Sequence, residues 1–238
     1  MGTGVVVTGG GSGIGRASAE ALLAIGRPVA VWDLDASGAP EGATRIDVDV
    51  ADAAAVEDAV VRTRAALPTI GGLVHAAGIV LIEPIGSIDF AGFQRVLDVN
   101  LVAFARIAQL LLPDLRASGS GASIVGVASI DALVGSSVNP AYCASKSGML
   151  GLVRSMAAEL GPGGIRVNAV CPGFIDTAMT APGLAIDGVR QHFEAASALK
   201  RIGQPADIAN VVRFLLSHDA AYITGQPIVV DGGTLATH

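Results

Sequence analysis

A tyrosine and a lysine that stand four residues apart are the strongest candidates for chemistry in this chain. Tyr142 and Lys146 lie in a segment with helical spacing, which brings both side chains to one face of a helix. A tyrosine has a pKa near about 10, and a neighbouring ammonium stabilises its phenolate and lowers that pKa. Ser129 stands thirteen residues before Tyr142, after an apolar run, and can hydrogen-bond a reacting oxygen. The three side chains predict general acid–base chemistry, whereas a tyrosine–lysine pair alone would be better interpreted as an incidental surface pair.

A glycine-rich turn near the start of the chain can hold a phosphate group. The segment TGGGSGIG, from Thr8 to Gly15, follows an apolar run of strand length and precedes a stretch with helical spacing. Glycines let the backbone approach a pyrophosphate, and a helix N-terminus offers free N–H groups and a partial positive charge. The strand before and the helix after favour nucleotide binding over a purely structural turn. The turn is not a Walker loop, because no Gly-Lys-Ser/Thr follows it.

Asp33 ends the second apolar run, beyond that turn. At this position a carboxylate accepts hydrogen bonds from the ribose hydroxyls of an adenine nucleotide, and it repels the 2′-phosphate of NADP. The alternative is an ordinary solvated turn residue beside Asp35. Leu34 brings no positive charge, and Arg16, just after the glycine-rich turn, decides little. We therefore expect NAD to be preferred by at least roughly tenfold in kcat/KM.

Apolar runs of strand length alternate with stretches of helical spacing along the chain. The pattern predicts strands at 4–8, 28–33, 43–48, 72–76, 123–128, 166–171 and 228–230. It predicts helices at 14–25, 53–67, 90–116, 142–160 and 207–216. This alternation is typical of an α/β fold: a doubly wound, mostly parallel sheet with helices on both faces and ligands at the carboxyl ends of the strands. The stretch 174–204 has no clear assignment, which is typical of a lid.

The length and composition of the chain limit the classes of protein to which it can belong. The chain has 238 residues, 51% of them hydrophobic, and a formal net charge of −6. This length suits a single α/β domain spanning 1–238. No basic cluster tracks phosphates and no Cys/His cluster has zinc-ligand spacing, so neither nucleic acid nor a metal is expected. The first apolar run is too short for a signal peptide or a membrane span, so we expect a soluble, cytoplasmic protein with reduced cysteines.

Together these motifs resemble the short-chain dehydrogenase/reductase family, in its single-domain branch. The resemblance rests on the glycine-rich turn, on Ser129 and on YCASK at 142–146. It also rests on DVAD at 49–52, on Asn100 in DVNL, on RVNAVCPG at 166–173 and on VDGG at 230–233. These motifs cover essentially the whole chain and are specific jointly rather than singly. The resemblance implies a Rossmann-type sheet of seven strands in the order 3-2-1-4-5-6-7, and hydride transfer between NAD(H) and a secondary alcohol or ketone.

The resemblance also implies a role for each site residue. Tyr142 would be the general acid/base, Lys146 would lower its pKa and bind the nicotinamide ribose, and Ser129 would orient the substrate oxygen and stabilise developing charge. Asn100 would hold a water that relays protons to Lys146. The cofactor-binding residues would be Gly9, Ser12, Gly13, Ile14, Gly15, Asp33, Asp49, Val50, Ala77, Gly78, Tyr142, Lys146, Pro172, Gly173, Ile175 and Thr177. Asp49 and Val50 would hold the adenine, and the last four would contact the nicotinamide end.

One stretch departs from the family pattern. After the fourth strand the family usually has Asn-Asn-Ala-Gly or Asn-Ala-Ala-Gly, whereas this chain has HAAG, from His75 to Gly78. The Ala-Gly pair still permits a close approach of the backbone to the cofactor. We interpret His75 as a buried hydrogen-bonding residue rather than as a second base.

The stretch at 178–198 would be the substrate lid by resemblance. It is mostly small or apolar, with Arg190 and His192 as isolated polar residues, which suits a compact and mainly uncharged substrate. Leu133, Val134 and Phe174 would add apolar walls, unless these residues only pack the lid onto the domain. A steroid, a cyclic alcohol, a sugar and a β-ketoacyl thioester all fit this pattern.

Two rival functions use parts of the same pattern. A dinucleotide-binding or scaffold protein that has lost catalysis would have no physical need of Asn100, Ser129, Tyr142 and Lys146 together. A sugar-nucleotide epimerase or dehydratase, from the longer branch of the family, would carry a sizeable additional C-terminal domain, whereas this chain ends soon after its last predicted strand.

The helices at 90–116 and 142–160 carry apolar residues on more than one face. The residues are Ala103, Phe104, Ile107, Leu110, Leu111, Met149, Leu150, Val153 and Met156. One face must cover the sheet, so the surplus predicts an isologous helix–helix interface. The resemblance implies a homotetramer, with a homodimer as the alternative, and a small molecule as substrate; no membrane partner is expected.

Overall fold

Seven parallel strands form one sheet in the order β3-β2-β1-β4-β5-β6-β7. The computed structural model describes residues 2–119 and 121–237. The strands are β1 (Gly4–Thr8), β2 (Val29–Asp33), β3 (Thr44–Asp47), β4 (Ile70–His75), β5 (Ser123–Val127), β6 (Arg166–Pro172) and β7 (Pro227–Val230). The strand order confirms the doubly wound α/β sheet expected from the sequence. The order reverses between β1 and β4, and ligands bind sheets of this kind at the carboxyl ends beside such a reversal.

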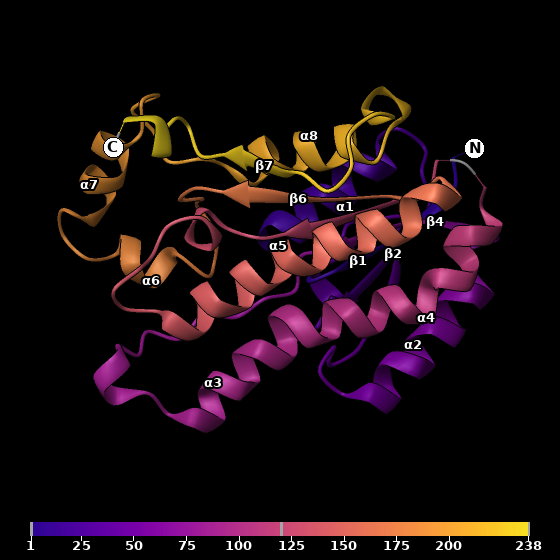
Figure 1. Cartoon of the computed structure of the whole chain (residues 1–238), viewed down its shortest axis with the longest axis horizontal. Helices are drawn as coiled ribbons and strands as arrows, with labels where there is room; N and C mark the ends of the chain where they lie inside the picture. The colour runs from indigo at the N-terminus through magenta and orange to yellow at the C-terminus, as the bar shows by residue number, and fades with distance from the viewer. Residues whose placement is uncertain (1, 120, 238) are drawn as a thin grey trace.

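Helices cover both faces of this sheet. On one face lie α2 (Ala53–Ala66), α4 (Ala103–Ala117) and α5 (Pro140–Leu160), and Figure 1 shows these three on the side nearer the viewer. On the other face α1 (Gly13–Leu23) packs beside α8 (Pro205–Leu215). Each face of the sheet therefore has its own apolar cluster.

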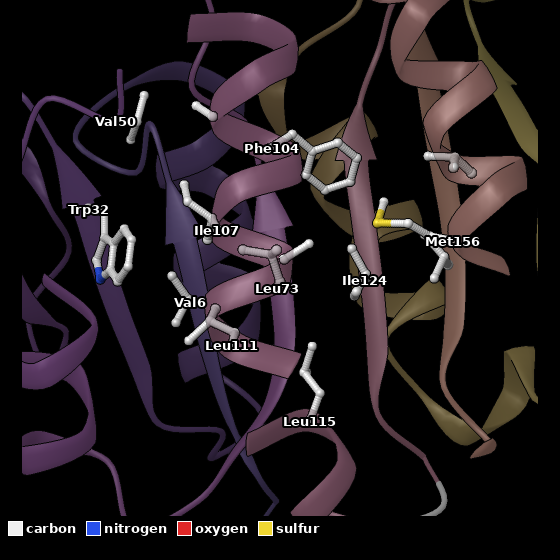
Figure 2. Packing of buried hydrophobic residues seen from close by; sticks show 14 of the residues in the cluster. Val6, Trp32, Val50, Leu73, Phe104, Ile107, Leu111, Leu115, Ile124 and Met156 are labelled. Carbon is white, nitrogen blue, oxygen red and sulfur yellow. The ribbon is translucent and has the colours of Figure 1, made fainter. Parts of the chain in front are cut away.

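The central strand β1 shows why such short apolar runs become buried strands. Val6 points into the cluster under α4, together with Trp32 and Leu73 (Figure 2), whereas Val5 and Val7 point into the cluster under α1 and α8. Successive side chains of a strand point to opposite faces, so a strand that is covered on both faces needs an apolar residue at every position.

The additional apolar residues that α4 and α5 carry on more than one face are buried within a single protomer. Eight of the nine residues that suggested an interface between copies are at most 8% exposed, and Leu110 is half-buried. In Figure 2, Phe104, Ile107 and Leu111 project from α4 onto the sheet. Both helices also pack on a neighbouring helix, α4 on α2 and α5 on α3 (Phe90–Leu97), so more than one face is buried in the protomer. Burial of these residues within the protomer therefore removes their support for an interface between copies, and that interface stays a prediction.

The helix expected at 90–116 is interrupted. The chain forms α3, then a π-helical turn at Asp98–Val102, and then α4. A π turn holds an additional residue, and such turns are frequent at functional sites; this one contains Asn100. The whole run Phe90–Ala117 is long and apolar enough to cross a membrane by length and composition, but α4 packs against the sheet as a core helix does.

The stretch at 174–204, which the sequence pattern left unassigned, contains two short helices. These are α6 (Ala181–Leu184) and α7 (Val189–Ala196). In Figure 1 both lie beyond the arrowheads of β6 and β7, on the left of the molecule. The segment therefore stands over the edge of the sheet where a ligand is expected.

Candidate active site

One cavity of about 280 Å³ opens at the carboxyl ends of the central strands. All 16 expected cofactor-binding residues line it, and so does Ser129, whereas Asn100 does not. The sequence analysis missed other lining residues, among them Trp32 and Arg95. The structure thus brings residues that are far apart in the chain to one place, as a dinucleotide site requires.

The glycine-rich turn passes from β1 into α1 along one wall of this cavity. Gly9 has a φ of +66°, and a Cβ atom there would lie 2.6 Å from the backbone nitrogen of Ala77. A Cβ atom at Gly15 would collide with the carbonyl of Gly9. Ser12 occupies the N-cap position of α1, but its side chain makes no capping hydrogen bond. The first N–H groups of α1 therefore lack a side-chain cap, at a helix start that lines the cavity and fits a phosphate group.

Asp33 is fixed at the end of β2, in the wall of the same cavity. Its Oδ2 accepts a hydrogen bond of 2.8 Å from the backbone nitrogen of Gly11, and its Oδ1 accepts one of 3.3 Å from the backbone nitrogen of Asp35. Arg16 does not line the cavity, and its guanidinium pairs with Glu20 at 3.0 Å. The carboxylate is therefore held in the cavity wall, at a position where it can accept a hydrogen bond from a ribose hydroxyl.

A second carboxylate lies where the resemblance expects the adenine. Asp49 Oδ2 accepts a hydrogen bond of 2.8 Å from Arg95 Nη2, and Asp49 Oδ1 accepts one of 2.9 Å from the backbone of Ala51. Arg95 comes from α3, 46 residues along the chain, and no sequence motif marks it. The ion pair fixes the carboxylate and adds a cation to this end of the cavity.

Lys146 is buried at the other end of the cavity. Its Nζ donates a hydrogen bond of 2.7 Å to the carbonyl of Val127, at the end of β5. The ammonium lies 5.4 Å from the centre of the Tyr142 ring, so both side chains point the same way from α5. Burial lowers the pKa of Lys146 to about 8, so that the ammonium is the main form at neutral pH.

Tyr142 holds its proton more tightly than an exposed tyrosine does. It is partly exposed to the cavity, but the protein surrounds its hydroxyl closely enough that desolvation raises its pKa to about 12. A hydrogen bond with Ser129 opposes that rise, and the charge of Asp131 adds to it. In the chain by itself burial dominates this pKa, and the ammonium of Lys146 donates its hydrogen bond to Val127, so the lowering by Lys146 stays a prediction. The phenol is therefore a proton donor at neutral pH.

Asn100 acts as a clamp on the loop after β4. Its Oδ1 accepts a hydrogen bond of 2.8 Å from the backbone nitrogen of Ile79, and its Nδ2 donates to the Ile79 carbonyl at 2.9 Å and to Ser145 Oγ at 3.0 Å. Both Nδ2 hydrogens are used, and the side chain is fully buried. Its place in a proton relay stays a prediction, whereas its hold on the cavity loop is a feature of the structure.

His75 is fully buried and hydrogen-bonded, as the sequence analysis expects. Its Nδ1 lies 3.0 Å from Thr8 Oγ1, and its Nε2 lies 3.2 Å from the carbonyl of Val99. Because a carbonyl only accepts, Nε2 carries the hydrogen, and Nδ1 accepts from the threonine hydroxyl. Thr8 Oγ1 in turn accepts from the backbone nitrogen of Ala77, and the imidazole stacks on Phe104. His75 thus ties the glycine-rich turn, the cavity loop and the π turn together.

Acid should destabilise the protein through this histidine. Burial, followed by the charge of Lys146, lowers the pKa of His75 from 6.5 to about 3. Between these values the unfolded chain takes up a proton that the folded protein refuses, so stability present above pH 6.5 is lost as the pH falls. We expect a loss of about 2 kcal/mol between pH 7 and pH 5 from this group. Urea unfolding at several pH values measures it.

Two variants separate His75 from the other groups that titrate in acid. His75→Asn removes the imidazole and should flatten this dependence, whereas His192→Gln, at an exposed position on α7, should keep it. Equal losses of unfolding free energy between pH 7 and pH 5 in wild type and His75→Asn would contradict the prediction.

The apolar walls differ from those expected. Leu133, Val134 and Phe174 do not line the cavity, and the ring of Phe174 stacks instead on Phe193 of α7, 3.6 Å between ring centres. Arg190 is paired with Asp176 at 3.0 Å. These contacts fasten α7 onto the loop after β6. Ala178, Met179 and Thr180 are the lid residues that reach the cavity.

Comparison with known proteins identifies relatives along almost the whole chain. A family model described as enoyl-(acyl carrier protein) reductase matches residues 9–234. An uncharacterised short-chain type dehydrogenase/reductase of Sinorhizobium fredii is 36% identical, over 94% of this chain and 92% of its own. The 3-oxoacyl-[acyl-carrier-protein] reductase MabA of Mycobacterium tuberculosis is 38% identical, over 96% of this chain and 91% of its own.

The solved structures agree with these relatives. The ligand-free aldohexose dehydrogenase of Thermoplasma acidophilum superposes with a TM-score of 0.94 at 30% identity, and the match covers 100% of this chain and 95% of that one.

Proposed function

Because the chain belongs to the short-chain dehydrogenase/reductase family, we propose that it transfers a hydride between NAD(H) and the carbon of a secondary alcohol or ketone. The observation that carries the proposal is that one and the same cavity wall holds the uncapped start of α1, Asp33 and the trio of Ser129, Tyr142 and Lys146. Along the sheet edge Asp33 follows β2, the start of α1 follows β1 and Ser129 follows β5, and an adenosine ribose, a pyrophosphate and a nicotinamide need partners in that order.

The chain's own residues supply the proton chemistry. When bound, NADH supplies a hydride to the carbonyl carbon. As the carbonyl oxygen gains negative charge, Tyr142 Oη donates its proton to that oxygen and Ser129 Oγ donates a hydrogen bond to it. Lys146 holds the nicotinamide ribose and places a positive charge beside the phenolate that remains. In the reverse direction the phenolate form of Tyr142 accepts the proton of the alcohol.

A compact, mainly uncharged substrate fits the site best. The residues of the lid that reach the cavity are small or apolar, and the nearby cations Arg95 and Arg190 are each paired with a carboxylate. The names of the relatives point to two classes of substrate, a 3-oxoacyl thioester and an aldohexose. The paired cations favour the uncharged sugar-like class over an acidic carrier protein, which would dock on free basic residues. Residues 178–198 would close over this substrate as a lid.

The family resemblance also supports a homotetramer in the cytoplasm, with no nucleic acid or membrane as partner. Light scattering at micromolar concentration should give four times the mass of the chain. A twofold mass would favour the homodimer, and the mass of a single chain would contradict the assembly.

A panel of ketones tests the proposed reaction. Purified protein and NADH are mixed with cyclic ketones, hydroxyketones and sugar-derived ketones, and the loss of NADH absorbance is followed. We expect turnover of at least one member. Tight NADH binding without turnover of any member would favour the rival function, a dinucleotide-binding scaffold protein.

A further inference from the structure

Asp131 is a half-buried carboxylate two residues beyond Ser129. Its backbone nitrogen donates a hydrogen bond of 3.1 Å to Ser129 Oγ, and its Oδ2 accepts one of 3.2 Å from Asn139 Nδ2. It does not line the cofactor cavity itself but stands next to Ser129 and Tyr142, which line the reacting end. The carboxylate therefore lies next to the position expected for the reacting oxygen of the substrate.

Asn139 holds Asp131 in this position. The asparagine is 8% exposed and precedes α5, three residues before Tyr142. Its Oδ1 accepts a hydrogen bond from Cys143 Sγ at 3.3 Å, so its Nδ2 is the atom left for the carboxylate. The neutral amide donates a hydrogen bond to one oxygen of Asp131 but does not neutralise the negative charge of that carboxylate.

Within residues 2–119 and 121–237, no lysine, arginine or histidine forms an ion pair with Asp131. Asp49, which lines the cavity, and Asp176, between the lining residues Ile175 and Thr177, are each paired with an arginine. Burial raises the pKa of Asp131, and its charge adds to the rise in the pKa of Tyr142. A partly desolvated carboxylate without a cation costs free energy, and such groups cluster at functional sites.

We propose that Asp131 is a specificity-determining residue that accepts a hydrogen bond from a donor group, a hydroxyl or an ammonium, carried by the substrate near its reacting carbon. The inference rests on the proposed function and narrows its substrate to hydroxyketones, polyols, sugars or amino ketones. Ser129 and Tyr142 take the reacting oxygen, and Asp131 Oδ1, which accepts no hydrogen bond from another of the described residues, would meet a neighbouring substituent. The same charge repels a substrate carboxylate at that place.

A charge-assisted hydrogen bond of this kind changes kcat/KM by roughly 10- to 100-fold. The probes are cyclohexanone, 2-hydroxycyclohexanone and 2-aminocyclohexanone, which differ only in the neighbouring donor. Steady-state kinetics with NADH give kcat/KM for each, and quenching of NADH fluorescence in rapid mixing, read before the hydride is transferred, gives their dissociation constants from the protein–NADH complex. Wild type should favour a donor-bearing ketone over cyclohexanone at least roughly tenfold in both measurements.

The variant Asp131→Asn removes the charge while its amide oxygen can still accept from Asn139. It should lose most of the donor preference, which is a ratio of kcat/KM values and therefore cancels any change at Tyr142 that affects all three ketones alike. Asp187→Asn removes one negative charge from an exposed position on the lid segment and should keep the preference. Whether the hydroxy or the amino ketone ranks first identifies the donor, and either order supports the role of the carboxylate.

Two results would overturn the inference: no donor preference in wild type, or an unchanged preference in Asp131→Asn. If the proposed function is wrong, the kinetic result differs from both of these, because no ketone is turned over at all. In that event the dissociation constants still decide whether Asp131 selects a donor group.

Discussion

Replacing Tyr142 with phenylalanine should lower kcat for ketone reduction by roughly 10²–10⁴-fold, the contribution expected from general acid catalysis. The change removes one oxygen atom from a side chain whose pKa of about 12 keeps it protonated at neutral pH. Binding of NADH should stay close to that of wild type, because Asp33, the start of α1 and Lys146 remain. Steady-state kinetics with a good ketone and an NADH fluorescence titration measure the two effects.

The chain supplies its own control for this experiment. Tyr222, its other tyrosine, is fully exposed and is not among the residues that line the cavity, so Tyr222→Phe should leave both measurements unchanged. If Tyr142→Phe keeps most of its activity, another group donates the proton and the assignment of Tyr142 is wrong.

The second large effect concerns the choice between NADH and NADPH. Wild type should prefer NADH by at least roughly tenfold in kcat/KM, because Asp33 repels the 2′-phosphate of NADPH. Two unit charges about 4 Å apart, at an effective dielectric constant near 20, interact by about 4 kcal/mol. Solvent screening and side-chain rotation reduce this, and half of it, about 2 kcal/mol, is still more than a tenfold preference.

Two variants of Asp33 separate its charge from its structural contact. Asp33→Asn removes the charge, and its amide oxygen can still accept from the backbone of Gly11, so the preference for NADH should shrink with the turn intact. Asp33→Ala should shrink it mainly by weakening the use of NADH. Asp35→Asn, at a neighbouring exposed carboxylate outside the cavity lining, should keep the wild-type ratio. Equal or better use of NADPH by wild type would show that another residue controls this pocket.

Much of the fold and of the site could be predicted because the signals are local. Buried strands appear as short apolar runs, and the glycine-rich turn stands between such a run and a helix, so both are visible within about ten residues of sequence. The spacing of Tyr142 and Lys146 fixes their common face whatever surrounds the helix. The strand order and the grouping of these residues at one sheet edge followed from the family resemblance.

What could not be predicted depends on contacts between distant segments. Nothing in the local sequence marks the π turn at Asp98–Val102, because neither glycine nor proline interrupts the helical pattern there. The pairing of Arg95 with Asp49 and the place of Asp131 beside Asn139 exist only in the folded chain. The pKa of Tyr142 is set by how deeply its hydroxyl is enclosed, which spacing does not reveal.

The buried faces of α4 and α5 show the same difficulty. An apolar pattern indicates that a face is covered but does not identify what covers it, and here the sheet and neighbouring helices of the same chain do so.

The central claim is that a hydride moves between NADH and a carbonyl carbon, and an isotope label tests it most directly. NADH deuterated at the transferred position of C4 is incubated with the protein and the best ketone of the panel, and the product is analysed by mass spectrometry. The account predicts an alcohol that carries one deuterium on its carbinol carbon, formed in step with NADH consumption and almost absent with Tyr142→Phe. An alcohol without deuterium, or no alcohol from any ketone while NADH is bound, would contradict it.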